Sequence, residues 1–246
     1  MPITITSRSR SPIKEGRDSA LPSLSQVPSI RDRYQQFVKV VGREFRRNRR
    51  LHGGKIRCKQ GCTDCCHQVF PITEVEAAEI SRGITTLDPQ LRARLVENAG
   101  AYLPRRAEIF NRHGYIRAWG HLPKPEMRLA CPALINGECA IYEQRPIHCR
   151  KVGMPLHHPE RSGRIFACEL NFRPGESYQD AQLVPIQSAM AEDWVQLQVE
   201  FDKRGGKREQ EPICVADALL KNYKARLPPE IEQADHSNVA ASSRPK

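Results

Sequence analysis

The sequence predicts a mainly α-helical protein in which several helices surround a cysteine-rich, largely irregular core with one short β-hairpin. Three observations support this fold class. Apolar residues recur at helical spacing in several segments along the 246 residues. The nine cysteines are concentrated in the middle of the chain, and 19 prolines and 15 glycines interrupt regular structure. No stretch approaches the ~18 consecutive apolar residues of a membrane span, so an integral membrane protein is excluded.

The first expected helix begins after Ser29, a good N-cap, and ends at Gly53-Gly54. One apolar stripe runs along it, formed by Ile30, Tyr34, Phe37, Val38, Val41 and Phe45. A second helix of about ten residues is expected after the capping box Thr73-Glu-Val-Glu76, ending at Gly83. The segment before this second helix holds the first cysteines.

Asp88-Pro89 predicts the start of a third helix, since proline is favoured at the first helical position. Pro104 either kinks this helix or starts another that runs to His113. Residues 133–141 contain Asn136-Gly137, the favoured two-residue hairpin turn, and are expected to form the hairpin.

Two more helices are expected near the carboxyl end of the chain. Apolar residues from Met190 to Phe201 mark one helix, which Gly205-Gly206 ends. Pro212 is expected to open the last helix, which includes Cys214 and continues to Tyr223. The sequence therefore predicts a single metal-binding domain over residues 29–226 with its cysteine core at 56–170, between a disordered basic tail at 1–28 and a disordered polar tail at 227–246.

The positive charge is concentrated at the amino-terminal end. Residues 1–57 hold 14 Lys and Arg against 4 Asp and Glu, a net charge of +10 out of +11 for the whole chain. Such a segment attracts an acidic partner, nucleic acid or an anionic membrane surface, or serves only as a solubilising tail. It lacks the interleaved aromatic residues of a single-strand binding platform.

The start of the chain shows no secretory signal, so we expect a cytoplasmic protein. In a reducing compartment, clustered cysteines indicate metal ligands or redox groups before disulfides. Buried free cysteines are the other alternative, and this interpretation is preferred for Cys214, which stands apart from the rest.

The first cysteine block is Cys58-x3-Cys62-x2-Cys65-Cys66, and soft thiolates of this kind select zinc, iron–sulfur clusters or copper(I). A straight helix from Cys58 to Cys66 would be ~12 Å long. Ligands of one ion lie less than ~5 Å from each other. The block must therefore bend around an ion, serve more than one ion, or hold a multi-iron cluster.

The second block adds Cys131, Cys139, Cys149 and Cys168, and it includes Arg145 and Arg150, whose charge would offset that of the thiolates. Whether His67, after the first block, or His148, before Cys149, completes a ligand set is left open. The chain has no nucleophile elbow, P-loop, dinucleotide fingerprint or zinc-protease motif, so no enzyme class follows from motifs.

The two blocks together resemble the bacterial YkgJ-like cysteine-cluster family, a family described as zinc- or iron-chelating. The resemblance rests on C-x3-C-x2-C-C, then C-P-x-L, then N-G-x-C-x-I-Y-x-x-R-P-x-x-C-R, then a later single cysteine, and it spans residues 56–170. It implies that eight cysteines bind iron, as an iron–sulfur cluster, or zinc: Cys58, Cys62, Cys65, Cys66, Cys131, Cys139, Cys149 and Cys168.

The resemblance does not assign a reaction or a binding partner. A metal-binding protein is the first hypothesis. An iron–sulfur-dependent protein-modifying enzyme or oxidoreductase is the second. A nucleic-acid-binding module that uses the basic N-terminal arm, its fold stabilised by metal, is the third.

Overall fold

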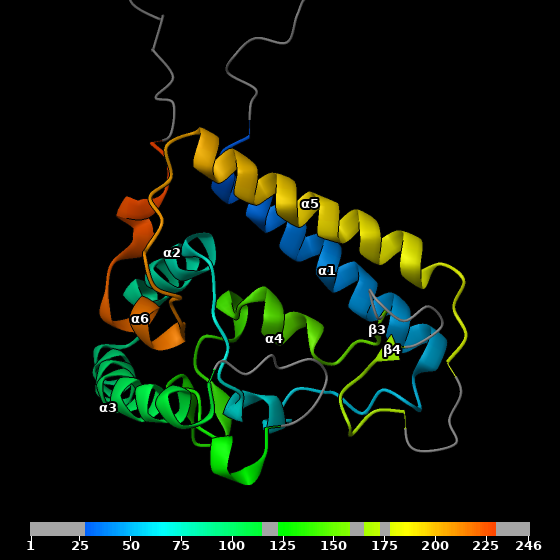
Figure 1. Ribbon diagram of the computed structural model, residues 1–246, viewed down its shortest axis with the longest axis horizontal. Helices are drawn as coiled ribbons and strands as arrows, with labels where there is room; N and C mark the ends of the chain where they lie inside the picture. The colour runs from blue at the N-terminus through cyan, green and yellow to red at the C-terminus, as the bar shows by residue number, and fades with distance from the viewer. Residues whose placement is uncertain (1–27, 115–122, 158–164, 173–177, 230–246) are drawn as a thin grey trace, which may run out of the picture. The chain divides into compact units, whose positions relative to one another are not determined.

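The computed structural model describes residues 28–114, 123–157, 165–172 and 178–229. The predicted mainly helical fold is confirmed. Two long helices, α1 (Ile30–His52) and α5 (Leu183–Lys203), lie side by side and antiparallel (Figure 1). Three more helices pack together beside them: α2 (Glu74–Gly83), α3 (Pro89–His113) and α6 (Val215–Leu220). The short helix α4 (Ile147–Lys151) packs against α1.

The amino ends of the first helices form as their sequence predicts. Ser29 caps α1, since its hydroxyl accepts a hydrogen bond from the Asp32 backbone N–H at 3.1 Å. Thr73 and Glu76 form the expected reciprocal capping box at the start of α2. Asp88 caps α3, which continues as one helix through Pro104 to His113. Pro104 therefore does not start a separate helix.

The carboxyl-terminal helices differ from the prediction. Helix α5 begins at Leu183, earlier than the first apolar residue that marks it in the sequence. Pro212 does not open α6, because the carbonyl of Ile213 accepts a hydrogen bond from the Ile72 N–H at 2.9 Å. The chain is extended there, so Cys214 becomes the N-cap of a shorter helix. Tyr223 lies in a separate 3₁₀ turn rather than in α6.

The hairpin at 133–141 is present as β1 (Leu134–Ile135) paired with β2 (Glu138–Cys139). Asn136 and Gly137 both have positive φ, 52° and 79°, as the favoured two-residue turn requires. A second antiparallel pair, β3 (Leu156–His157) with β4 (Ile165–Phe166), was not predicted, since two-residue strands give no periodic signal.

The apolar residues form two clusters. One lies among α2, α3 and α6 and includes Ile80, Leu95 and Leu219. The other lies between α1 and α5, where the ring centroids of Phe37 and Trp194 are 5.2 Å apart. The segments that carry the cysteines connect the helices around these two clusters, so helix packing brings the cysteine blocks near each other.

None of the helices in the described part of the chain has both the length and the apolar character needed to cross a bilayer. The segments predicted to be disordered tails lie outside the described residues, apart from position 28 and positions 227–229. The extent of the single domain therefore stays a prediction.

A buried ion-pair network at the end of α1 gives the fold a defined pH dependence. The hydrogen bond from Arg47 holds the pKa of Asp180 below its ordinary value of 3.8. The stability that this lowered pKa adds is complete above the ordinary value of 3.8 and is lost as the pH falls through the lower folded-state pKa. We expect Asp180→Asn to be less stable than wild type at pH 7 and to lose less stability between pH 5 and pH 2.

Urea unfolding at several pH values measures this difference. Asp193→Asn, a change at an exposed position on α5, is the matched control and should follow the wild-type pH profile. Parallel profiles for wild type and Asp180→Asn would show that the contact with Arg47 adds no stability.

Candidate metal centre

The two cysteine blocks meet through their backbones. The first block ends in a 3₁₀ turn, Asp64–His67. The N–H of Cys131 donates to the carbonyl of Cys66 at 2.7 Å, and the N–H of Leu129 donates to that of His67 at 3.1 Å. The segment that begins the second block therefore lies alongside the turn that carries Cys65 and Cys66.

Cys65 lies near the thiols of the second block. Burial raises the pKa of Cys131 to about 12, and the thiols of Cys139, Cys214 and Cys65 raise it further. Burial also raises the pKa of Cys139 and of Cys149, and Cys65 adds to both shifts. Like-charge effects of this kind require thiols that are close together.

Cys65 is also close to a second set of thiols. Burial raises the pKa of Cys58 to about 11, with further contributions from Cys65, Cys62 and Cys168. The pKa of Cys168 is raised by burial and then by Cys65 and Cys62. The pKa of Cys65 itself is raised by its hydrogen bond with Cys66 and by burial. Cys65 therefore interacts electrostatically with two sets of thiols. One set is Cys58, Cys62 and Cys168, and the other is Cys131, Cys139 and Cys149.

The chemistry of this donor set fits a thiophilic metal, because all nine cysteines are free thiols and eight of them belong to the two blocks. The geometry is not that of a preformed mononuclear site. Among the residues that the structure describes, no three Cys, His, Asp or Glu side chains form a group that could hold an ion as they stand. Binding therefore requires side-chain rotation or a polynuclear cluster that spans the two sets.

Asn171 connects the segments that carry the first set of thiols. It is 2% exposed, and its Oδ1 accepts from the Arg57 N–H at 2.7 Å while its Nδ2 donates to the Gly153 carbonyl at 3.1 Å. Its own N–H donates to the Cys168 carbonyl at 2.7 Å. This one amide side chain therefore links the residues next to Cys58 to the Cys168 loop and to the segment after α4.

Gly153 is the second residue of the site that the sequence does not indicate. A Cβ at this position would lie 2.5 Å from Sγ and 2.6 Å from Cβ of Cys58, and 2.9 Å from an edge carbon of Phe45. Only glycine allows the chain after α4 to approach Cys58 this closely. Backbone φ at Gly153 gives no further reason for glycine, so the requirement is one of space.

Gly153→Ala is expected to displace Cys58 and to destabilise the protein by about 1–3 kcal/mol through overpacking. Gly100→Ala is the matched control, since nothing lies within 4 Å of the added methyl group and the residue is inside α3. That change should stabilise the protein by about 1 kcal/mol. Thermal and urea unfolding measure both, and equal effects of the two substitutions would contradict the close packing at Cys58.

Two arginines lie beside the thiols, as the sequence suggests. Arg145 lowers the pKa of Cys58 and of Cys139 by its positive charge, against the larger effect of burial. Arg145 donates to the Tyr142 carbonyl at 3.0 Å, and Arg150 donates from Nε to the Arg145 carbonyl at 2.9 Å. Neither forms an ion pair with another described residue, so their charge is available to offset thiolates.

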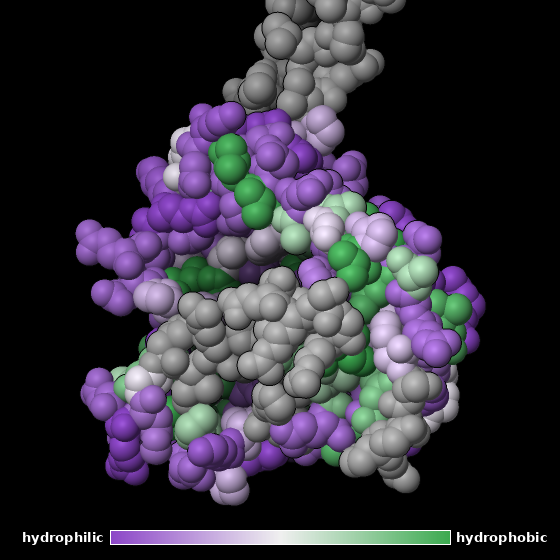
Figure 2. Space-filling model, turned by 45° about the vertical axis from the view of Figure 1, so that its right-hand side comes forward, coloured by the Kyte–Doolittle hydropathy of each residue, from purple (hydrophilic) through white to green (hydrophobic). Residues whose placement is uncertain are grey.

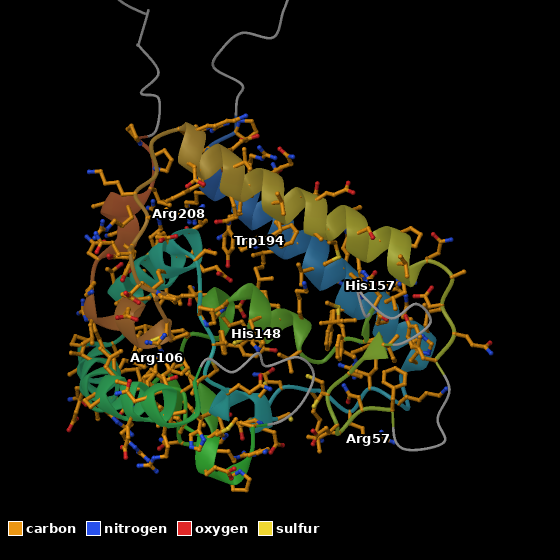
Figure 3. All side chains as sticks on the ribbon, viewed as in Figure 1. Arg57, Arg106, His148, His157, Trp194 and Arg208 are labelled. Carbon is orange, nitrogen blue, oxygen red and sulfur yellow. The ribbon has the colours of Figure 1, made fainter. Side chains whose placement is uncertain are left out.

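The two histidines differ in their surroundings. Nδ1 of His67 lies 3.2 Å from the Thr63 carbonyl within the same turn. Nε2 of His148 lies 3.0 Å from the side-chain oxygen of Gln68, and its ring stacks on Phe70 with the centroids 4.2 Å apart. His148, which Figure 3 shows on α4, also lines a cavity.

Cys214 differs from the other eight cysteines. It is 2% exposed, and its thiol donates to Oδ2 of Asp217 at 3.2 Å. It belongs to the apolar cluster of α2, α3 and α6. These contacts agree with its interpretation as a buried free cysteine.

Comparison with known proteins supports the class of the site. Residues 57–163 match the family model named CxxCxxCC and described as a "putative zinc- or iron-chelating domain". This confirms the resemblance to the YkgJ-like family. The match includes seven of the eight cysteines of the two blocks and ends before Cys168. No curated protein and no solved structure matches the chain.

Proposed function

We propose that the protein binds iron, as an iron–sulfur cluster, or zinc through the cysteines of its two blocks. The observation that carries the proposal is the position of Cys65, whose thiol interacts with thiols from both blocks. The match of residues 57–163 to a zinc- or iron-chelating family supports the same function. In this proposal the metal supplies folding free energy to the cysteine core at residues 56–170, whose irregular segments show little apolar periodicity.

Cys58, Cys62, Cys65 and Cys168 would form one side of the centre, and Cys66, Cys131, Cys139 and Cys149 the other. Thiolate sulfur is the ligand of both structural zinc and iron–sulfur clusters. Eight thiolates suffice for two four-ligand centres or for one cluster with spare thiols. When bound, zinc would supply a structural cross-link, whereas an iron–sulfur cluster would also supply one-electron chemistry.

Anaerobic purification followed by iron, zinc and acid-labile sulfide analysis tests the proposal. A brown protein with iron and sulfide in similar amounts identifies an iron–sulfur cluster, and a colourless protein with zinc identifies a zinc site. A chain that remains folded and free of both metals after expression in medium with iron and zinc would refute the proposal.

The exposed face of α1 favours a second function, the binding of nucleic acid. Four exposed cations follow each other at helical spacing on it: Lys39, Arg43, Arg46 and Arg50. None of them forms an ion pair with another described residue. Such a row can contact the phosphates of a nucleic acid backbone.

Electrophoretic mobility shifts with a 20-base-pair DNA duplex at increasing salt measure this binding. Substitution of these four α1 cations by glutamine should weaken DNA binding and reduce its salt dependence. Four substitutions to glutamine on α3, at the exposed Arg94, Arg105 and Arg112 and at the partly buried Arg92, should change it less. Equal losses would mean that only the total charge matters.

A further inference from the structure

A cavity lies on the side of α4 away from the cysteines. Its volume is about 480 Å³, within the range of small-molecule sites. Ile147 and Met154 line it from α4 and the segment that follows, Phe166 from β4 and Trp194 from α5. Figure 3 shows Trp194 on α5 above His148 on α4. Figure 2 shows hydrophobic residues exposed among hydrophilic ones on one face of the molecule.

Most polar groups that line this cavity already have partners. Oε2 of Glu76 accepts from the N–H and the hydroxyl of Thr73 at 2.8 and 2.9 Å, and Oε1 accepts from the Ile147 N–H at 2.8 Å. Nε2 of His148 lies 3.0 Å from the side-chain oxygen of Gln68, and its ring stacks on Phe70. Both oxygens of Glu76 are therefore taken up by donors of the protein, and Nε2 of His148 is taken up by Gln68.

Lys151 is the exception. It is half-buried and lines the cavity, yet its ammonium group forms no hydrogen bond or ion pair with another described residue. Lys151 is the last residue of α4 and lies three and four positions after His148 and Ile147, so the three share one side of the helix. All three line the cavity. The cavity therefore offers one cation without a direct partner, together with the hydrogen-bonded carboxylate of Glu76 and mainly apolar walls. An occupant that gives this cation a direct acceptor would be favoured.

We propose that this cavity binds a small organic carboxylate with an apolar body, its carboxylate paired with Lys151 and its apolar part packed against Trp194 and Phe166. A single ammonium group matches the single charge of a carboxylate better than the double charge of a phosphate monoester. The aromatic and aliphatic walls match an aryl or alkyl group rather than a sugar.

The cavity is separate from the candidate metal centre. Cys149 is not among the residues that line it, although Ile147, His148 and Lys151 of the same short helix are. Cys149 instead interacts with the thiols of Cys131, Cys65 and Cys139. The ligand would touch none of the cysteines. Ligand titration and metal analysis therefore test the two proposals separately.

Titration with 4-phenylbutyrate and its neutral analogue 4-phenylbutan-1-ol tests the proposal on the full chain as purified. The chain has two tryptophans, so Trp119→Phe leaves Trp194 as the only indole and its fluorescence as the readout. We expect saturable quenching by 4-phenylbutyrate and about tenfold weaker binding of the alcohol, the loss typical of one charge-assisted contact. No saturable binding, or equal affinity for acid and alcohol, would overturn the proposal.

Lys151→Met keeps the aliphatic stem and removes the charge. This change should weaken the binding of 4-phenylbutyrate by about tenfold and leave the affinity for the alcohol nearly unchanged. Lys151→Arg should retain most of the preference for the acid. Lys203→Met, at an exposed position outside the cavity, is the matched control and should change neither affinity. If Lys151→Met binds the acid as tightly as wild type, Lys151 is not the partner. The acid–alcohol comparison on the unmutated cavity decides the proposal even if this variant does not fold.

Discussion

Cys65→Ser is expected to remove most of the bound metal, with a loss in affinity of roughly tenfold or more. Serine keeps the size of the side chain but replaces a soft thiolate with a hydroxyl, which zinc and iron–sulfur clusters bind poorly. Among the cysteines, Cys65 interacts with thiols of both sets, so its loss should affect the whole centre. The segment after it should then become sensitive to protease, since the metal no longer stabilises it.

Metal analysis of the purified variant and limited proteolysis measure the two effects. Cys214→Ser is the control, because the Cys214 thiol donates a hydrogen bond to Asp217 within the apolar cluster. This substitution should leave the metal content unchanged. We expect Cys62→Ser and Cys139→Ser, one from each set, to lower the metal content as well. Equal metal content in all four variants would contradict the proposed ligands.

Arg47→Met is expected to lower the free energy of unfolding by about 3–5 kcal/mol, the usual cost of removing one partner of a buried ion pair. Arg47 donates to Glu44 at 2.7 and 2.8 Å and to Asp180 at 2.5 Å. The two carboxylates are 3% and 5% exposed, so both would be left buried without their cation. The pair with Asp180 also connects the end of α1 to the segment before α5.

Urea unfolding at pH 7 measures this loss. Arg112→Met is the matched control, since Arg112 pairs with Glu108 on the exposed face of α3, with the two side chains 66% and 65% exposed. That change should cost less than about 1 kcal/mol. If Arg47→Met costs no more than Arg112→Met, the buried network does not stabilise the fold.

The helices that the sequence predicts correctly are those with strong local signals. Ser29, Thr73 and Asp88 are N-caps whose hydrogen bonds involve residues two or three positions away, so the sequence alone is sufficient. The start of α6 could not be predicted in this way. A hydrogen bond between Ile72 and Ile213, far apart in the sequence, keeps Pro212 outside the helix.

The candidate site shows the same division. The cysteines and the adjacent arginines could be found from their spacing, because metal ligation requires particular residue types. Asn171 and Gly153 could not, since their roles are one set of long-range hydrogen bonds and one close contact with Cys58. Lys151 could not be identified either, because the surroundings of its side chain depend on how α4 packs within the fold.

X-ray absorption spectroscopy at the iron or zinc edge of the anaerobically purified protein tests the central claim most directly. Metal bound by the cysteines should show a shell of sulfur neighbours at about 2.3 Å. An iron–sulfur cluster should add a second shell of iron neighbours. A first shell made only of oxygen or nitrogen at about 2.0–2.2 Å, with no sulfur, would contradict metal binding by the two cysteine blocks.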